Sequence, residues 1–210
     1  MRGRFITFEG GEGAGKSTQV ARLAERLADR VGAPLLTREP GGSDGAERIR
    51  ELLVTGATDR WSSLSEALLI FAAREDHLRR AIRPALESGR WVICDRFSDS
   101  TRAYQGAAGG VSSALISALE AEVIAQTRAD LTLILDVPVE TGLQRALARG
   151  GGEGRFEAKG IAFHERLRAE FHAIAAAEPE RCVVIPANSS PAMVGDRIWN
   201  AVCQKFGWTS

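Results

Sequence analysis

The stretch "RFITFEGGEGAGKST", residues 4–18, joins an apolar segment to a glycine-rich one and indicates the fold of the chain. An apolar, β-rich run that ends at Gly10 is typical of a short buried strand. Val20, Leu23 and Leu27 follow at the spacing of an amphipathic helix. The glycines therefore lie where a strand gives way to a helix, in a turn that must bring its backbone close to something.

That turn fits the P-loop pattern G-x-x-x-x-G-K-[ST]. In such a turn the backbone N–H groups surround a polyphosphate, and the helix N-terminus adds its positive dipole end. Lys16 is expected to reach the β- and γ-phosphates, and the Ser17 hydroxyl to hold Mg²⁺. The dinucleotide pattern G-x-G-x-x-G fails, because Lys16 and Thr18 stand where its last glycine would be. The residues expected to bind ATP are Gly10, Gly11, Gly13, Ala14, Gly15, Lys16, Ser17 and Thr18.

Strands and helices are expected to alternate along the rest of the chain. Apolar strands are predicted within 4–10, 33–42, 90–96, 130–138 and 182–186. Helices are predicted at 16–30, 45–54, 62–89 with Pro84 interrupting its last turns, 113–127, from 139, up to 178, and at the C-terminal end. Alternation of this kind predicts an α/β fold of P-loop NTPase type, a three-layer arrangement with a five-stranded parallel sheet flanked by helices. We expect a single domain, 1–210, with the glycine-rich stretch "RGGGEGRFEAKG" (149–160) as a small lid.

Composition limits the classes of partner. Lys plus Arg and Asp plus Glu are both 27 in 210 residues, and this zero net charge argues against a nucleic-acid partner. The three cysteines form no C-x-x-C pair, which argues against a zinc site or a disulfide framework. No apolar run reaches the roughly 18 residues that a membrane span requires. These features predict a cytoplasmic protein with no membrane partner.

Three further segments narrow the kind of P-loop protein. They are "REPGG" (38–42), "FAAREDH" (71–77) and "ICDRFSDSTRAYQG" (93–106). Together with the P-loop, in this order and spacing, they resemble bacterial thymidylate kinases from Phe5 to about residue 190. No N-K-x-D motif of a GTPase is present. The resemblance implies transfer of a phosphoryl group from ATP to dTMP with Mg²⁺, giving dTDP.

The resemblance also implies roles for residues around the acceptor phosphate. Arg96 would contact that phosphate, and Asp95 would lie near the metal with Ser17. Glu12 matches an acidic position close to the acceptor sugar and phosphate. Arg50 matches an arginine that binds the acceptor phosphate. Pro40, which is flanked by Arg38 and Glu39, matches a loop that shapes the acceptor pocket.

A second set of matches concerns the acceptor base and sugar. Arg74 matches an arginine that hydrogen-bonds the thymine ring. Thr101 and Gln105 match positions that read the edge of the thymine. Tyr104 matches a ring that crowds the 2′ position of the sugar. The family's base-stacking phenylalanine stands four residues before this arginine, where the present chain has Ile70. Either Phe71 stacks on the base from a shifted position, or an aliphatic contact replaces the stacking.

The glycine-rich stretch corresponds to the family's lid. Gly154-Arg155-Phe156-Glu157 stands where relatives have D-R-[IL]-E, so that the aspartate is missing. Arg155 is the candidate for stabilising the transferring phosphoryl group, with Arg149 and Arg145 in support. Catalysis would thus rest on Glu12, Lys16, Arg96 and Arg155.

Two other functions stay open on the sequence alone. One is a kinase for another nucleotide or a nucleoside, which would not need Arg74, Thr101 and Gln105 to read thymine. The other is a nucleotide-dependent switch, which would leave the acceptor-site residues unexplained. The resemblance further implies a homodimer formed through helices beside the sheet, and "SEALLIFAA" (65–73) is the candidate segment.

Overall fold

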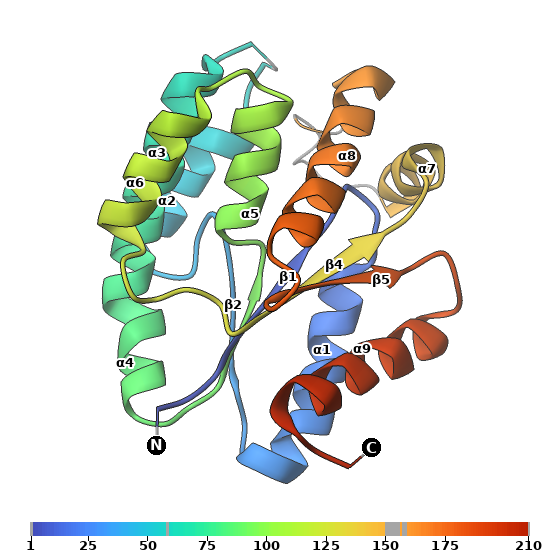
Figure 1. The fold of residues 1–210 in the computed structure, drawn as a ribbon. Helices are drawn as coiled ribbons and strands as arrows, with labels where there is room; N and C mark the ends of the chain where they lie inside the picture. The colour runs from blue at the N-terminus through green and yellow to red at the C-terminus, as the bar shows by residue number, and fades with distance from the viewer. Residues whose placement is uncertain (1, 58, 150–155, 157–158, 210) are drawn as a thin grey trace.

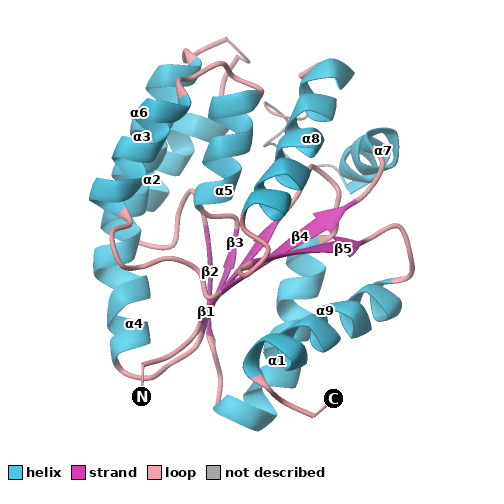
Figure 2. Ribbon diagram, viewed as in Figure 1, coloured by secondary structure: helices cyan, strands magenta, loops and turns pink. Residues whose placement is uncertain are grey.

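A computed structural model describes residues 2–57, 59–149, 156 and 159–209. Its centre is a sheet of five parallel strands in the order β2-β3-β1-β4-β5 (Figures 1 and 2). The strands are β1 (Phe5–Glu9), β2 (Leu35–Arg38), β3 (Val92–Asp95), β4 (Leu131–Asp136) and β5 (Cys182–Pro186). This confirms the predicted five-stranded parallel sheet flanked by helices.

Helices cover both faces of the sheet and give the molecule three layers (Figure 2). The α-helices are α1 (Lys16–Val31), α2 (Asp44–Val54), α3 (Ser63–His77), α4 (Arg83–Glu87), α5 (Ser98–Thr101), α6 (Ser113–Val123), α7 (Val139–Arg149), α8 (Ile161–Ala177) and α9 (Pro191–Phe206). Two π-helical segments, η1 (Leu78–Ile82) and η2 (Arg102–Ala107), extend α3 and α5. No helix among the described residues is long and apolar enough to cross a membrane.

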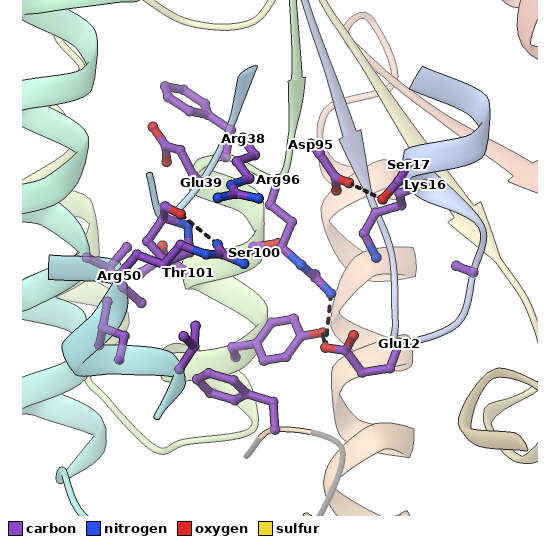
Figure 3. Close-up of a pocket in the computed structure, with 18 of the residues that line it drawn as sticks. Glu12, Lys16, Ser17, Arg38, Glu39, Arg50, Asp95, Arg96, Ser100 and Thr101 are labelled. Carbon is purple, nitrogen blue, oxygen red and sulfur yellow. Dashed lines mark hydrogen bonds and ion pairs between the residues drawn. The ribbon is translucent and has the colours of Figure 1, made fainter. Parts of the chain in front are cut away.

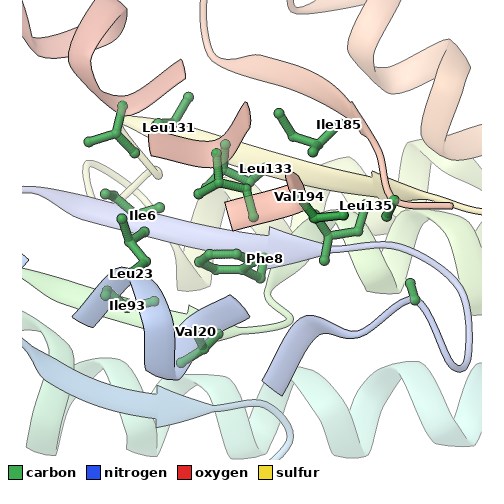
Figure 4. Packing of buried hydrophobic residues seen from close by; sticks show 14 of the residues in the cluster. Ile6, Phe8, Val20, Leu23, Ile93, Leu131, Leu133, Leu135, Ile185 and Val194 are labelled. Carbon is green, nitrogen blue, oxygen red and sulfur yellow. The ribbon is translucent and has the colours of Figure 1, made fainter. Parts of the chain in front are cut away.

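The main core lies between the sheet and the pair α1 and α9 (Figure 4). Alternate residues of a strand point to opposite faces, so Ile6 and Phe8 of β1 turn towards α1 while Phe5, Thr7 and Glu9 face the other layer. Val20 and Leu23 of α1 pack on this face, as the helical spacing predicted. Burial of the apolar side chains in this layer anchors the P-loop at both of its ends.

The long helix predicted at 62–89 forms as α3, η1 and α4. The π-helical turn of η1 interrupts it directly before Pro84, which lies in the first turn of α4, so the predicted interruption near Pro84 is present. One segment differs from expectation. The stretch after β3 forms α5 and η2, for which no helix was predicted. Four residues of α5 are too short to show amphipathic periodicity, so only the tertiary fold reveals this helix.

Candidate active site

A cavity of about 510 Å³ opens at the carboxyl ends of β1, β2 and β3 (Figure 3). Parallel strands deliver the loops that follow them to one edge of the sheet, which is where such folds bind ligands. The predicted residues that line it are Glu12, Gly13, Ala14, Gly15, Lys16, Ser17, Thr18, Pro40, Arg50, Arg74, Asp95, Arg96, Thr101, Tyr104 and Gln105. Segments that are distant in the sequence therefore converge on one space.

Three predicted residues have other positions. Gly10 and Gly11 line a smaller neighbouring cavity beneath the P-loop. Phe71 is only 2% exposed and does not line the main cavity, whereas Ile70 does. The reason is helical geometry: Phe71 of α3 turns inward with Arg74, three residues later, whose guanidinium carbon lies 4.9 Å from the phenylalanine ring centroid. The structure therefore has Ile70, and not Phe71, at the cavity wall, and the contact with the base stays a prediction.

The P-loop is held open by backbone geometry. Gly13 and Gly15 have positive φ angles of 65° and 89°, which glycine adopts without steric cost. A Cβ at Gly13 would collide with the carbonyl oxygen of Gly142 in α7. Helix α1 begins at Lys16 after Gly15, so the first N–H groups of the helix point at the cavity without a side-chain cap. This arrangement can bind a phosphate.

The Lys16 side chain folds over the P-loop, and its ammonium group contacts the loop backbone. Its Nζ donates to the carbonyl oxygens of Gly10, at 3.1 Å, and Gly11, at 2.9 Å. Burial and the nearby Arg96 cation lower the pKa of Lys16 to about 8, although Asp95 and Glu12 act in the opposite direction. A polyphosphate would replace the two carbonyl acceptors and favour the charged form of the lysine.

Ser17 and Asp95 form the candidate metal site. Ser17 Oγ donates a 2.9 Å hydrogen bond to Asp95 Oδ2, at the end of β3. A hydroxyl beside a carboxylate is an all-oxygen donor pair, which fits Mg²⁺ bound by one or two protein ligands together with phosphate oxygens and water. The described residues contain no group of three or more His, Cys, Asp or Glu side chains that could hold a metal ion. The donor set therefore suits a metal that arrives with a nucleotide.

Arg96, Glu12 and Tyr104 form a charged cluster at the middle of the cavity. Arg96 Nη2 lies 3.0 Å from Glu12 Oε1, and Tyr104 Oη donates to the same oxygen at 2.7 Å. Burial alone would raise the pKa of Glu12, but Arg96, Lys16 and the Tyr104 hydroxyl together lower it to about 2. Burial alone would lower the pKa of Arg96, but Tyr104, Glu12 and Asp95 raise it. Both partners are therefore charged at neutral pH.

The far end of the cavity carries the residues expected to read a base. Arg74 Nη2 donates to Thr101 Oγ1 at 3.0 Å, and Gln105 Nε2 donates to Glu66 Oε2 at 3.0 Å. Near them, Arg50 Nη1 donates to the carbonyl oxygen of Pro40 at 2.7 Å. The predicted set for the base and the acceptor phosphate is thus assembled, and its roles remain predictions.

Sequence reasoning missed Glu9 and Ser100. Glu9 is fully buried, and its carboxylate accepts hydrogen bonds from the Phe97 backbone N–H at 2.8 Å and from Ser100 Oγ at 2.5 Å. Burial and then Asp99 raise the pKa of Glu9 to about 7, despite opposing contributions from Ser100 and Arg96. Ser100 also accepts a bond from Arg96 Nη1, at 3.2 Å. A glutamate ending the apolar run "FITFE" was the one visible sign of this contact.

The expected lid lies mostly outside the described residues. This applies to Arg155, Gly154 and Glu157, and to the side chain of Arg149. Phe156 is described and lines the cavity, with its ring 5.6 Å from that of Tyr104. Arg145 points elsewhere: its Nη2 lies 3.2 Å from Asn188 Oδ1 in the loop between β5 and α9.

Comparison with known proteins gives a consistent result. The family model described as thymidylate kinase matches residues 8–198. A thymidylate kinase of Caulobacter vibrioides is 60% identical over 206 residues, 98% of this chain and 99% of that protein. One from Rhodopseudomonas palustris is 58% identical over 205 residues, 96% of this chain and 89% of that protein. The crystal structure of a thymidylate kinase from Ehrlichia chaffeensis superposes with a TM-score of 0.80 at 36% identity, covering 96% of this chain and 100% of that one.

Proposed function

This chain belongs to the thymidylate kinase family and phosphorylates dTMP with ATP, and we propose that the residues of the main cavity divide that reaction among them. The observation that carries the proposal is the continuity of the cavity. It runs from the P-loop at Lys16, past Arg96, to Arg74 and Thr101. One space can therefore hold a donor phosphate chain and an acceptor nucleotide end to end.

The donor half consists of the P-loop and the end of β3. The backbone from Gly10 to Thr18 surrounds the ATP phosphates, and Lys16 neutralises the β- and γ-phosphates. Ser17 and Asp95 would hold Mg²⁺ through their oxygen atoms. When bound, Mg²⁺ offsets phosphate charge and orients the transferring group.

The acceptor half brings two arginines to the dTMP phosphate. Arg96 and Arg50 neutralise it, which allows two anions to approach each other. Glu12 accepts from the sugar hydroxyl, and Tyr104 crowds the 2′ position. Arg74, Thr101 and Gln105 read the base, while Ile70 provides the apolar contact and Pro40 shapes the entrance. The protein makes no covalent intermediate, because phosphoryl transfer needs mainly positioning and charge neutralisation.

The lid completes the site in this proposal. The segment 149–160 closes over the phosphates and excludes water, and Arg155 stabilises the transferring phosphoryl group. The lid belongs to the same single domain as the P-loop. The enzyme works in the cytoplasm on small molecules. Its zero net charge argues against a nucleic-acid partner.

We further place a homodimer contact on the outer helices. Large apolar side chains are exposed on α2, α3 and α6, namely Leu52 at 40%, Leu64 at 46%, Leu68 at 49% and Leu115 at 37%. Helix α3 packs against both α2 and α6, so these leucines belong to adjoining elements. Exposed apolar surface on neighbouring helices is typical of a protein–protein contact.

A coupled ADP-release assay with ATP and Mg²⁺ tests the whole proposal. It uses a panel of nucleoside monophosphates and nucleosides and a control without acceptor. We expect fast turnover with dTMP, weaker turnover with dUMP, because the methyl group is worth only about 1–3 kcal/mol, and none with purines. ADP release that needs no acceptor, or that needs a different one, would contradict the roles assigned to the acceptor half.

A further inference from the structure

Arg74 is a buried cation with one nitrogen left over. The side chain is 1% exposed, with Nε donating to Glu39 Oε2 at 2.7 Å and Nη2 donating to Thr101 Oγ1 at 3.0 Å. Among the described residues, Nη1 has no hydrogen-bond partner. Because a buried N–H without an acceptor is costly, this nitrogen points to an acceptor supplied by a ligand in the cavity that Arg74 lines.

Glu39, whose carboxylate accepts from Arg74, also contacts a buried histidine through its second oxygen. Glu39 is 4% exposed, and its second oxygen, Oε1, lies 3.0 Å from Nδ1 of His77, which is fully buried. A carboxylate can only accept, so Nδ1 carries the hydrogen. In the neutral ring Nε2 then accepts from the Thr37 hydroxyl, 2.7 Å away. The chain of contacts runs Thr37, His77, Glu39, Arg74.

This chain of contacts ties α3 to the end of β2. Arg74 and His77 lie three residues apart on one face of α3, while Thr37 and Glu39 come from β2 and the residue after it. Gly42 leaves space for the contact between His77 and Thr37, since a Cβ at Gly42 would collide with His77 Nε2 and Thr37 Oγ1. The rings of Phe71 and Phe97, with centroids 4.9 and 5.1 Å from the guanidinium carbon, enclose Arg74 further. The guanidinium cannot rotate without breaking buried hydrogen bonds.

We propose that Glu39, His77 and Thr37 are positioning residues that lock Arg74 so that Nη1 meets a carbonyl oxygen of the acceptor base, and that this lock selects keto pyrimidines over amino pyrimidines. The inference rests on the function proposed above and adds residues that act through Arg74; Glu39 also lines the cavity, whereas Thr37 and His77 do not. In Figure 3, Glu39 and Thr101 lie across the cavity from Lys16 and Glu12, on the side away from the phosphate-binding loop.

The selection follows from donor and acceptor chemistry. Thymine and uracil present an acceptor oxygen at position 4, whereas cytosine presents an amino donor there. A fixed N–H facing an amino group leaves both donors unpaired, and a site built for hydrogen bonding rejects such a mismatch strongly. A mobile guanidinium could turn aside and tolerate cytosine. The lock therefore affects discrimination as well as affinity.

The experiment compares three variants of the full chain with a matched control. Glu39→Gln removes the charge, His77→Phe removes both ring contacts, and Thr37→Val removes only the most distant hydroxyl at nearly constant shape. Asp76→Asn is the control, because Asp76 precedes His77 on α3 and accepts from Ser43 Oγ at 2.7 Å, outside the cavity. Turnover is measured with dTMP and dUMP, dCMP is titrated as a competitive inhibitor, and Tm is recorded for each variant.

In Glu39→Gln and His77→Phe we expect KM for dTMP and dUMP to rise in parallel by about tenfold or more, with a smaller change in kcat. The Ki of dCMP should change little, so the ratio of Ki(dCMP) to KM(dTMP) falls about tenfold. Thr37→Val should shift the ratio in the same direction by about threefold. The control should leave it unchanged.

A lower Tm with an unchanged ratio in all three variants would overturn the proposal and leave a purely structural role. An equal shift in Asp76→Asn would do the same. If Glu39→Gln and His77→Phe fail to fold, Thr37→Val alone decides. A wild-type chain that turns over a different acceptor would instead contradict the proposed function, which makes the two failures distinguishable.

Discussion

Arg96 and Glu12 are 84 residues apart in the sequence, and Arg96 Nη2 lies 3.0 Å from Glu12 Oε1. The contact joins the end of β3 to the middle of the P-loop. Arg96 has a φ of 69°, a left-handed conformation that costs a non-glycine residue about 1–2 kcal/mol. Its N–H donates to Phe8 O at 2.9 Å and its Nη1 to Gly10 O at 3.0 Å, and these bonds hold the strained turn. This turn directs the guanidinium into the main cavity.

Arg96→Lys should lower kcat with dTMP by about 10²-fold or more, because one ammonium cannot reproduce the planar fork that reaches Gly10, Ser100 and Glu12 together. Steady-state kinetics with dTMP check this. Arg79→Lys, at an exposed position of η1, is the matched control and should behave like the parent chain. Retention of kcat within about twofold in Arg96→Lys would contradict the assigned role.

The lowered pKa of Lys16, about 8, predicts a pH dependence for ATP capture. Above that pH the free enzyme loses the ammonium, so kcat/KM for ATP should fall about tenfold per pH unit, because kcat/KM reports the free enzyme. The value of kcat should hold to a higher pH, since bound phosphates favour the charged lysine. Glu12, with a pKa of about 2, stays ionised throughout and adds no step.

A pH series of initial rates at varied ATP concentration separates these effects. Lys16→Arg is the control: its activity should be lower, but its kcat/KM profile should be flat above pH 8, because arginine keeps its charge and Glu9, with a pKa of about 7, has already titrated below that pH. A descending limb near pH 8 that persists in Lys16→Arg would assign the titration to another group.

Ile70 and Phe71 should respond differently to truncation. Ile70 lines the cavity, so Ile70→Ala should raise KM for dTMP several-fold and leave KM for ATP unchanged. Phe71 is buried beside Arg74, so Phe71→Leu should lower the free energy of unfolding by about 1–2 kcal/mol, mainly through lost packing. Kinetics and urea unfolding of both variants check this. A larger effect on dTMP binding from Phe71→Leu than from Ile70→Ala would restore Phe71 as the base contact.

Asp99 and Arg181 form a partly buried ion pair that joins α5 to the residue before β5. Asp99 is 1% exposed, and Arg181 donates to its two oxygens at 2.7 and 2.9 Å. Arg181→Met should destabilise the fold by about 3 kcal/mol, because it leaves a buried carboxylate without its main partner. The double variant with Asp99→Asn should recover part of that loss. Arg79→Met, at an exposed pair, should cost at most about 1 kcal/mol in the same chemical unfolding assay.

The exposed leucines of α3 predict the dimer contact. Leu68→Glu should shift the chain from dimer to monomer in light scattering, because a charge would be buried against apolar surface. Leu147→Glu on α7, which alters a leucine that is 74% exposed and away from these helices, is the control and should leave the mass unchanged. A monomeric parent chain would contradict the proposed homodimer directly.

Much of this molecule was predictable from local patterns. The strands and the long helices have apolar spacing that shows in the sequence, and the glycines of the P-loop report the positive φ angles that the turn requires. The inward turn of Phe71 and the presence of α5 were not predictable. The first depends on which face of α3 meets the sheet, and the second on contacts that a four-residue segment makes only after folding.

The sequence by itself determined the parallel sheet, the phosphate-binding turn and the family, because each depends on residues that are close together or on motifs in a set order. The tertiary structure alone decided which side chains meet. Arg96 with Glu12 and Glu9 with Ser100 come together because parallel strands deliver their carboxyl ends to one edge of the sheet, and Arg74 meets Glu39 because α3 lies beside that edge. Glu12 and Arg96 are charged because the fold pairs them with each other, since burial alone would disfavour both charges.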